Sequence, residues 1–280
     1  MKKKILILSL VLVLAISTLV LTGCVVGTGD MQDHSVTVEG NFDAIRASHI
    51  AVVIFNYSEE HSVRVVAQSN VFNALRISNR SGTLRIRARN NVSITTGAQN
   101  LPRIYVTAPS MNSLRLSGSA RAENWDTIEG QEFDIRTSGS SRAALDFYSP
   151  RNLSITSSGS SVLEVNSNSI DNAEITASGS SRLTVGGDFN RIGITASGSS
   201  NLTFEGDATA ITTNTSGSSV IAARDLNTIT VTISSSGSSR TNITVSNIIS
   251  GSASGSSRVV FYGGATNTVS TSGSATVTAG

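Results

Sequence analysis

The stretch Ile155–Val165 reads ITSSGSSVLEV, a Ser-Gly-Ser tripeptide between two short apolar segments. The tripeptide recurs through the second half of the chain at spacings of 18 to 21 residues. Its glycines are Gly118, Gly139, Gly159, Gly179, Gly198, Gly217, Gly237, Gly255 and Gly273. A repeat of nearly constant, short period is typical of solenoids, in which each repeat forms one coil and neighbouring coils bury its apolar side.

Apolar and polar residues alternate on both sides of each glycine. Positions four and six residues away are mostly Ile, Val, Leu or Phe, and the odd positions between them are mostly polar. This period of two is typical of β-strands with one buried face, whereas a helix would need apolar spacings of three and four. Positions two residues away are small, with Ser, Thr or Ala before the glycine and usually Ser after it. Two strands are therefore expected to meet at a tight glycine corner, with the inward serine hydroxyls bonded to their own backbone or to the next coil.

These features predict an all-β fold, a right-handed parallel β-helix (β-solenoid) with coils of about 19 residues. The right hand follows from the strong preference of parallel crossover connections for that hand. The remaining residues of each coil, such as Asn166–Ser169, are turn formers and predict a less regular third side. A β-propeller is the structural alternative, although its blades need about twice this period.

The N-terminus has the features of a sorting signal. Lys2–Lys4 precede an apolar run from Ile5 to Leu21, and Leu21-Thr22-Gly23-Cys24 resembles the lipobox of bacterial lipoproteins. We therefore expect residues 1–23 to be a lipoprotein signal peptide and Cys24, the single cysteine, to be the lipidated residue. An uncleaved membrane anchor is the alternative, because the apolar run approaches the length that spans a bilayer.

Removing the signal peptide changes the charge balance. The chain from Cys24 carries 18 basic residues, all arginine, against 19 acidic ones, so a basic nucleic-acid-binding surface is not expected. Residues 24–34 are predicted to be a short tether and residues 35–279 one β-helix. Within it, 35–110 are expected to form irregular coils that lack the Ser-Gly-Ser corner and cap or broaden one end, and 111–279 the regular coils. A separate small β domain for 35–110 is the alternative.

The strongest outward pattern is a set of arginines three residues after the corner glycine. We call these residues the arginine column: Arg121, Arg142, Arg182, Arg240 and Arg258. Guanidinium groups bind carboxylates and sulfates in a fork geometry, so the column is a candidate site for an acidic glycan. The alternative is a solvated face balanced by acidic neighbours. Trp125, Phe147, Tyr148 and Tyr262 are candidates for stacking on sugar rings.

Other chemistry has little support in the sequence. The carboxylates are scattered, the three histidines do not have the spacing of a metal site, and no Gly-x-Ser-x-Gly nucleophile elbow occurs in a strand–helix context. We therefore predict no catalytic residues, no metal and no cofactor.

Several segments resemble the bacterial head GIN domain family of auto-transporter adhesins over most of residues 36–279. The order is Gly40–Ile45, Val52–Ile54, Ser62–Val65, Gly82–Ile86 and Val106–Ser110, followed by Leu114–Ala120. The resemblance implies a parallel β-helix that is often secreted or lipid-anchored, and it carries over no catalytic residue. Two features are expected to depart from the family: charged faces rich in Asp or Lys are not evident, and we expect no autotransporter barrel after Gly280.

The sequence thus predicts a non-enzymatic, lipid-anchored β-solenoid of the cell envelope, displayed at the outer membrane or cell surface. Its expected partners are the membrane, through Cys24, and a polysaccharide or an envelope protein. Two other functions stay open: a polysaccharide lyase or hydrolase on the same fold, and a structural spacer of the envelope.

Overall fold

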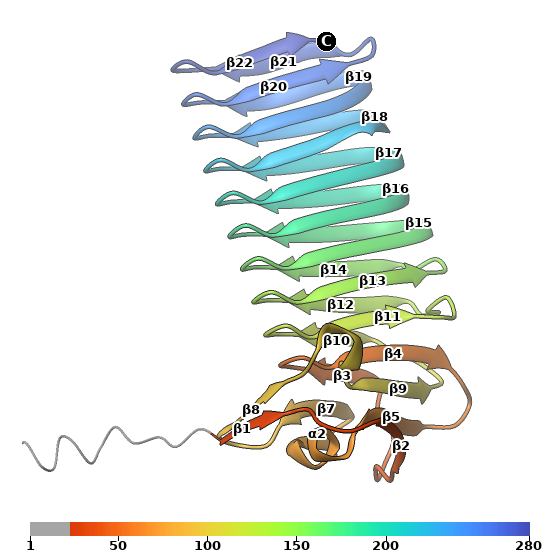
Figure 1. Ribbon diagram of the computed structural model, residues 1–280. Helices are drawn as coiled ribbons and strands as arrows, with labels where there is room; N and C mark the ends of the chain where they lie inside the picture. The colour runs from red at the N-terminus through yellow and green to blue at the C-terminus, as the bar shows by residue number, and fades with distance from the viewer. Residues whose placement is uncertain (1–22) are drawn as a thin grey trace, which may run out of the picture.

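The computed structural model describes residues 23–280, and the predicted signal peptide lies outside them apart from Gly23. The chain forms a β-solenoid of stacked parallel coils, with β1 (Gly23–Val26), β7 (Thr83–Ala88) and β8 (Val92–Thr95) at one end. The C-terminal strands β21 (Thr266–Thr271) and β22 (Thr276–Ala279) lie at the other end (Figure 1).

The regular coils are of two kinds. Nearer the N-terminus a coil has two short strands: β10 (Ser113–Leu116) and β11 (Arg121–Asn124), β12 (Glu132–Thr137) and β13 (Arg142–Phe147), then β14 (Asn152–Ser157). From β15 onward one long strand runs from corner to corner: β15 (Val162–Ala177), β16 (Arg182–Ala196), β17 (Asn201–Thr215), β18 (Val220–Ser235) and β19 (Arg240–Ala253). β20 (Arg258–Tyr262) follows the next corner.

The turns predicted for the third side are wrong for these longer coils, although the predicted lower regularity is present as register shifts. Asn166–Ser169 lies within β15, because the parallel ladder with the next coil continues through the bend. The register shifts between Asn166 and Ser169, and this bulge absorbs the extra residue while the strand turns.

The corner glycines lie in a single file. All nine have φ between 66° and 71°, a region that side-chain-bearing L-residues rarely adopt. The residue after each glycine donates a backbone hydrogen bond to the carbonyl of the previous corner, as Ser160 does to Gly139 at 2.8 Å and Ser180 does to Gly159 at 2.7 Å. The sequence repeat is thus the repeat of the coil.

The core follows the predicted alternation. Side chains at even distances from the glycines fill the bore, and Leu163, Leu183 and Leu202 form one of its buried rows. The inward corner serines are also buried, including Ser161 and Ser239. Buried apolar residues from Phe42 to Phe261 form one cluster, so the described chain has one continuous core.

The segment 35–110 contains one regular coil that we did not predict. β3 (Ala44–Ala47) and β4 (Val52–Tyr57) stack in parallel register on β10 and β11. His49, with φ 70°, occupies the corner position beneath Gly118. These residues lack the Ser-Gly-Ser tripeptide, but the corner itself is present, with histidine where the other coils have glycine.

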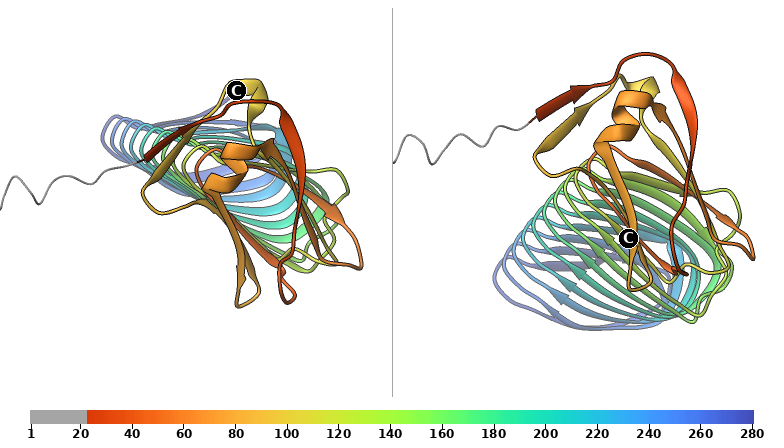
Figure 2. Two further views of the ribbon diagram at one scale, coloured as in Figure 1. Left: turned by 60° about the horizontal axis from the view of Figure 1, so that its bottom comes forward. Right: turned by 90° about the horizontal axis from the view of Figure 1, so that it is seen from below.

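The rest of this segment closes the N-terminal end. β7 and β9 (Arg103–Ala108) stack in parallel on β3 and β4, and β5 (Ser62–Gln68) and β6 (Leu75–Arg80) pair antiparallel with β9 and β7. Helix α2 (Ser69–Ala74) joins β5 to β6, and the 3-10 turn η1 (Ala98–Asn100) precedes β9. Seen from this end, α2 and its neighbouring strands lie across the coils (Figure 2). This end of the solenoid is thus made partly of antiparallel strands rather than of irregular coils alone.

The predicted tether is replaced by paired strands. β1 pairs in parallel with β8, and β2 (Met31–Val36) pairs antiparallel with β5. Val25 packs partly buried against the core cluster. Residues 24–34 are held to the cap because the exposed edges of β8 and β5 supply backbone partners. Cys24 itself is exposed.

Candidate binding surfaces

The arginine column is in register across the face that follows the corner. Arg121 pairs with Arg142, and Arg240 pairs with Arg258. Arg182 stands between Val162 and Asn201, so the structure brings the five residues together as two pairs and a single side chain. Arg103, which sequence reasoning missed, lies two strands below Arg121 in the same row, with Val52 between them.

Aromatic side chains stand beside the N-terminal end of this column. Trp125 follows β11, and its side chain is 63% exposed. Its ring meets Tyr105 edge to face at 5.5 Å, and the guanidinium of Arg64 lies 4.1 Å from the centre of the Tyr105 ring. The exposed indole, the Tyr105 ring and the guanidinium of Arg64 thus offer apolar stacking and charge recognition together.

The other predicted aromatics differ in exposure. Tyr148 is exposed, but Phe147 is buried and packs against Phe133, so its prediction as a stacking residue was wrong. An alternating strand puts every second residue inside, and Phe147 falls on the inward phase. Tyr262 is partly covered by the guanidinium of Arg224, 4.5 Å from the ring centre.

A second basic surface was not predicted from the sequence. It lies on the outer face of the sheet formed by β6, β7, β3, β10 and β12, in that order. Arg85, Arg46, Arg115 and Arg136 pair in register along one row, and Arg76 lies opposite Arg87 at the antiparallel edge. We call this set the arginine face: Arg46, Arg76, Arg80, Arg85, Arg87, Arg115 and Arg136.

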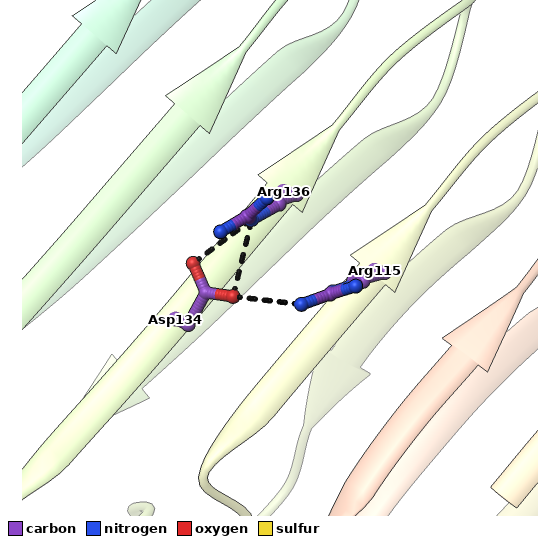
Figure 3. A network of polar contacts seen from close by, with 3 residues as sticks. All are labelled: Arg115, Asp134 and Arg136. Atoms are coloured by element: carbon purple, nitrogen blue, oxygen red, sulfur yellow. Dashed lines mark hydrogen bonds and ion pairs between the residues drawn. The ribbon is translucent and has the colours of Figure 1, made fainter. Parts of the chain in front are cut away.

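One carboxylate, that of Asp134, partly compensates the charge of two arginines of this face. Asp134 accepts hydrogen bonds from Arg136 at 3.1 Å and from Arg115 at 3.3 Å (Figure 3). Within residues 23–280 the other five arginines of the face make no ion pair with a carboxylate. The uncompensated charge is thus concentrated on β3, β6 and β7.

Part of the arginine face could be predicted from the sequence. Arg76 and Arg80 alternate with Ile77 and Asn79, and Arg85 and Arg87 alternate with Ile86, which predicts basic faces on two strands. These arginines lie beside Arg46 because β6 pairs antiparallel with β7 and because the coil of β3 and β4 turns at His49. The Ser-Gly-Ser repeat predicts neither feature.

Two grooves collect carboxylates. The larger, about 1050 Å³, crosses the outer face from β12 to β17 and is lined by Glu132, Asp134, Glu174 and Arg191 among others. The second, about 760 Å³, follows the bend of the long strands and contains Asp171, Asp188 and Asp207. Sequence reasoning treated these acids as scattered, but stacking of the coils brings them into two grooves.

Neither groove has a recognisable metal cluster: among residues 23–280, no group of three His, Cys, Asp or Glu side chains is arranged to hold an ion. The histidines lie apart, with His34 stacked on Phe72 and the His61 Nε2 3.0 Å from the Phe42 carbonyl oxygen. The pKa of Tyr57 is raised above its usual value, chiefly because the phenol donates a 2.6 Å hydrogen bond to Glu59. No helix of the described residues is long and apolar enough to cross a membrane.

The fold places the chain in the class of parallel β-solenoids. The chain belongs to the family described as "Putative auto-transporter adhesin, head GIN domain", whose model matches residues 41–184 and 164–265. This confirms the resemblance drawn from the sequence. The search of curated proteins found no match.

Three solved structures share the fold. A putative adhesin from Parabacteroides merdae has a TM-score of 0.69 at 14% identity, covering 92% of this chain and 99% of its own. A putative lipid binding protein from Parabacteroides distasonis has a TM-score of 0.67 at 17% identity, covering 92% and 99%. A putative adhesin from the same species has a TM-score of 0.67 at 16% identity, covering 92% and 100%. At these identities the likeness shows the fold alone. The family supports an adhesin-like role at the cell surface or envelope.

Proposed function

We propose that this protein is a lipid-anchored adhesin of the cell envelope that binds acidic polysaccharide without cleaving it. The binding surface is the N-terminal end of the arginine column, formed by Arg103, Arg121, Arg142 and Trp125. The observation that carries the proposal is the position of Trp125, which is 63% exposed and follows the same strand as Arg121. The exposed indole and the neighbouring Tyr105 ring together offer an apolar face on which a sugar ring can stack.

Sugar acids suit this surface chemically. A uronic acid or sulfated sugar has an apolar ring face for Trp125 and an anionic group for a guanidinium fork. Because Arg121 and Arg142 belong to adjacent coils, their backbones are about 4.8 Å apart, and a polymer lying along the column meets both.

Anchoring through Cys24 is the second part of the proposal. The lipobox-like Leu21–Cys24 supports it, as does the exposure of the thiol-bearing residue. Metabolic labelling with a fatty acid in a bacterial host should mark the wild-type chain and leave Cys24→Ser unmarked. Labelling of both forms would remove the anchor from the proposal without affecting polysaccharide binding.

The binding test uses the chain from residue 23 with Cys24→Ser, because residues 23–280 share one core. Retention on an immobilised polyuronate is compared with retention on neutral dextran. Arg121→Gln/Arg142→Gln and Trp125→Ala should each lose retention, while Arg151→Gln/Arg224→Gln, which removes the same charge elsewhere, should keep it. Equal retention of all four forms would contradict the assigned surface.

A polysaccharide hydrolase or lyase is the second candidate, favoured by the groove that holds Glu132, Glu174 and Arg191. Carboxylates and an arginine in one groove are the groups that such enzymes use. Release of oligosaccharides from the polyuronate, lost in Glu174→Gln, would establish this function in place of the first. No retention and no release on any acidic or neutral polymer would favour a structural spacer.

A further inference from the structure

The arginine face places positive charges next to one another on adjacent strands. Arg85, Arg46, Arg115 and Arg136 stand on four adjacent strands in register, an arrangement in which like charges repel across each strand pair. Asp134 compensates the last two, whereas Arg85 and Arg46 have no carboxylate partner among the described residues. The buried Nε of Arg85 also has no hydrogen-bond partner.

The unpaired arginines line one hollow in the arginine face. Its volume is about 280 Å³, and its walls include Arg46, Arg76, Arg80, Arg85 and Arg87. Three serines, Ser48, Ser78 and Ser117, complete the polar lining, and no carboxylate is among the lining residues. Asp43, the acidic residue just before β3, is bonded instead to Asn112 at 3.0 Å. Guanidinium and hydroxyl groups that line one hollow, with no carboxylate among them, can donate hydrogen bonds to a phosphate group.

This hollow lies towards Cys24. A neighbouring hollow of about 320 Å³ shares Ser48 and Arg87 with it, adds Arg89, and extends to Ser93 of β8. Ser93 pairs directly with Cys24 of β1, and the Gly23 amide donates to the Asn91 carbonyl at 2.8 Å. The arginine face therefore begins beside Cys24, at the end of the solenoid where β1, β7 and β8 lie together (Figure 1).

We propose that the arginine face docks on anionic phospholipid headgroups, with a lipid phosphate in the Arg46–Arg85–Arg87 hollow. This proposal rests on the proposed lipid anchor at Cys24. Because Cys24 lies in a strand that is paired with β8, its lipid would hold this end of the solenoid at the level of the headgroups. A single lipid attachment gains stable membrane binding from a second, electrostatic contact. Each arginine near an anionic bilayer contributes about 1 kcal/mol.

The test uses the unlipidated chain from residue 23 with Cys24→Ser, so its outcome does not depend on lipidation. Co-sedimentation is measured with vesicles of phosphatidylcholine alone and of phosphatidylcholine with phosphatidylglycerol. The chain should bind only the anionic vesicles, and added salt should weaken binding. Arg46→Gln/Arg85→Gln/Arg87→Gln should bind about a hundredfold more weakly, from three contacts of that strength.

Two further variants separate position from total charge and from folding. Arg151→Gln/Arg191→Gln/Arg224→Gln loses the same charge elsewhere and should bind like wild type. Arg46→Lys/Arg85→Lys/Arg87→Lys should retain most vesicle binding, since headgroup attraction needs charge near the surface. Equal weakening by both glutamine triples, or no binding to anionic vesicles, would overturn the proposal. Loss of polyuronate retention by the Arg46 triple with unchanged vesicle binding would instead assign the hollow to a polysaccharide.

Discussion

Gly179 lies so close to Gly159 that a β-carbon placed on it would be 2.8 Å from the Gly159 carbonyl oxygen. The same oxygen accepts the backbone hydrogen bond from Ser180, so it cannot move away without breaking the corner ladder. Gly179→Ala should therefore lower the free energy of unfolding by about 3 kcal/mol, combining the cost of a positive φ with overpacking. Urea unfolding followed by circular dichroism measures this, with Gly264→Ala as control, because a β-carbon there meets nothing within 4 Å. Equal effects of the two substitutions would show that the corner tolerates a side chain.

His49 provides the opposite test of the same corner. It has φ 70° at the first position of the file, where the following coils have glycine. His49→Gly should raise the free energy of unfolding by about 1 kcal/mol, because glycine adopts this conformation without the penalty of a β-carbon. His49→Ala keeps the β-carbon and should give no such gain. If alanine stabilised as much as glycine, the imidazole rather than the backbone would be the source of the strain.

The inward serines divide into bonded and unbonded members. Ser239 shares a 2.9 Å hydrogen bond with Ser235 and donates to the Ser236 carbonyl at 2.9 Å, whereas the buried hydroxyl of Ser200 has no partner. Ser239→Ala should lower the free energy of unfolding by about 1 to 2 kcal/mol, because it leaves Ser235 with fewer partners. Ser200→Ala should leave stability unchanged or raise it by up to about 1 kcal/mol, since an unpaired buried hydroxyl is removed. Thermal unfolding of the two single variants compares them directly, and a larger loss in Ser200→Ala would contradict this division.

The difference between these serines also shows how far sequence reasoning extends. The repeat predicted the coil, the inward phase and the buried corner serines, because those depend on period and alternation alone. Which hydroxyls are paired does not follow from the repeat. Ser200 has Ala196 two residues before its glycine and is unpaired, but Ser141 is also unpaired although Thr137 stands at that position. Ser181 bonds to the Ser157 carbonyl although Ala177 stands there.

The two candidate binding surfaces also differ in whether the repeat predicts them. The arginine column was predictable because its members share one offset from a visible glycine. The arginine face was not, because Arg85 reaches Arg46 through a parallel pairing of strands separated by the whole of β4, β5 and β6. The tether prediction failed for a related reason: the edges that hold β1 and β2 are supplied by segments with no repeat to reveal their position.

The last coil should be the least protected part of the solenoid. β21 and β22 have a coil on one side only, and their inward residues Val269 and Val277 are partly exposed, whereas Val231 in β18 is buried. Asn267 continues the inward row of Val231 and Ile249, so the row ends on a polar side chain. Local opening requires little loss of buried apolar area there, and amide exchange should be fastest in β22 and slowest in β17 and β18. Hydrogen–deuterium exchange followed by mass spectrometry tests this gradient on the monomeric chain. Protection of β22 equal to that of β17 at low protein concentration would mean that stacking on one side is sufficient, and that the coils do not depend on neighbours in the way the repeat implies.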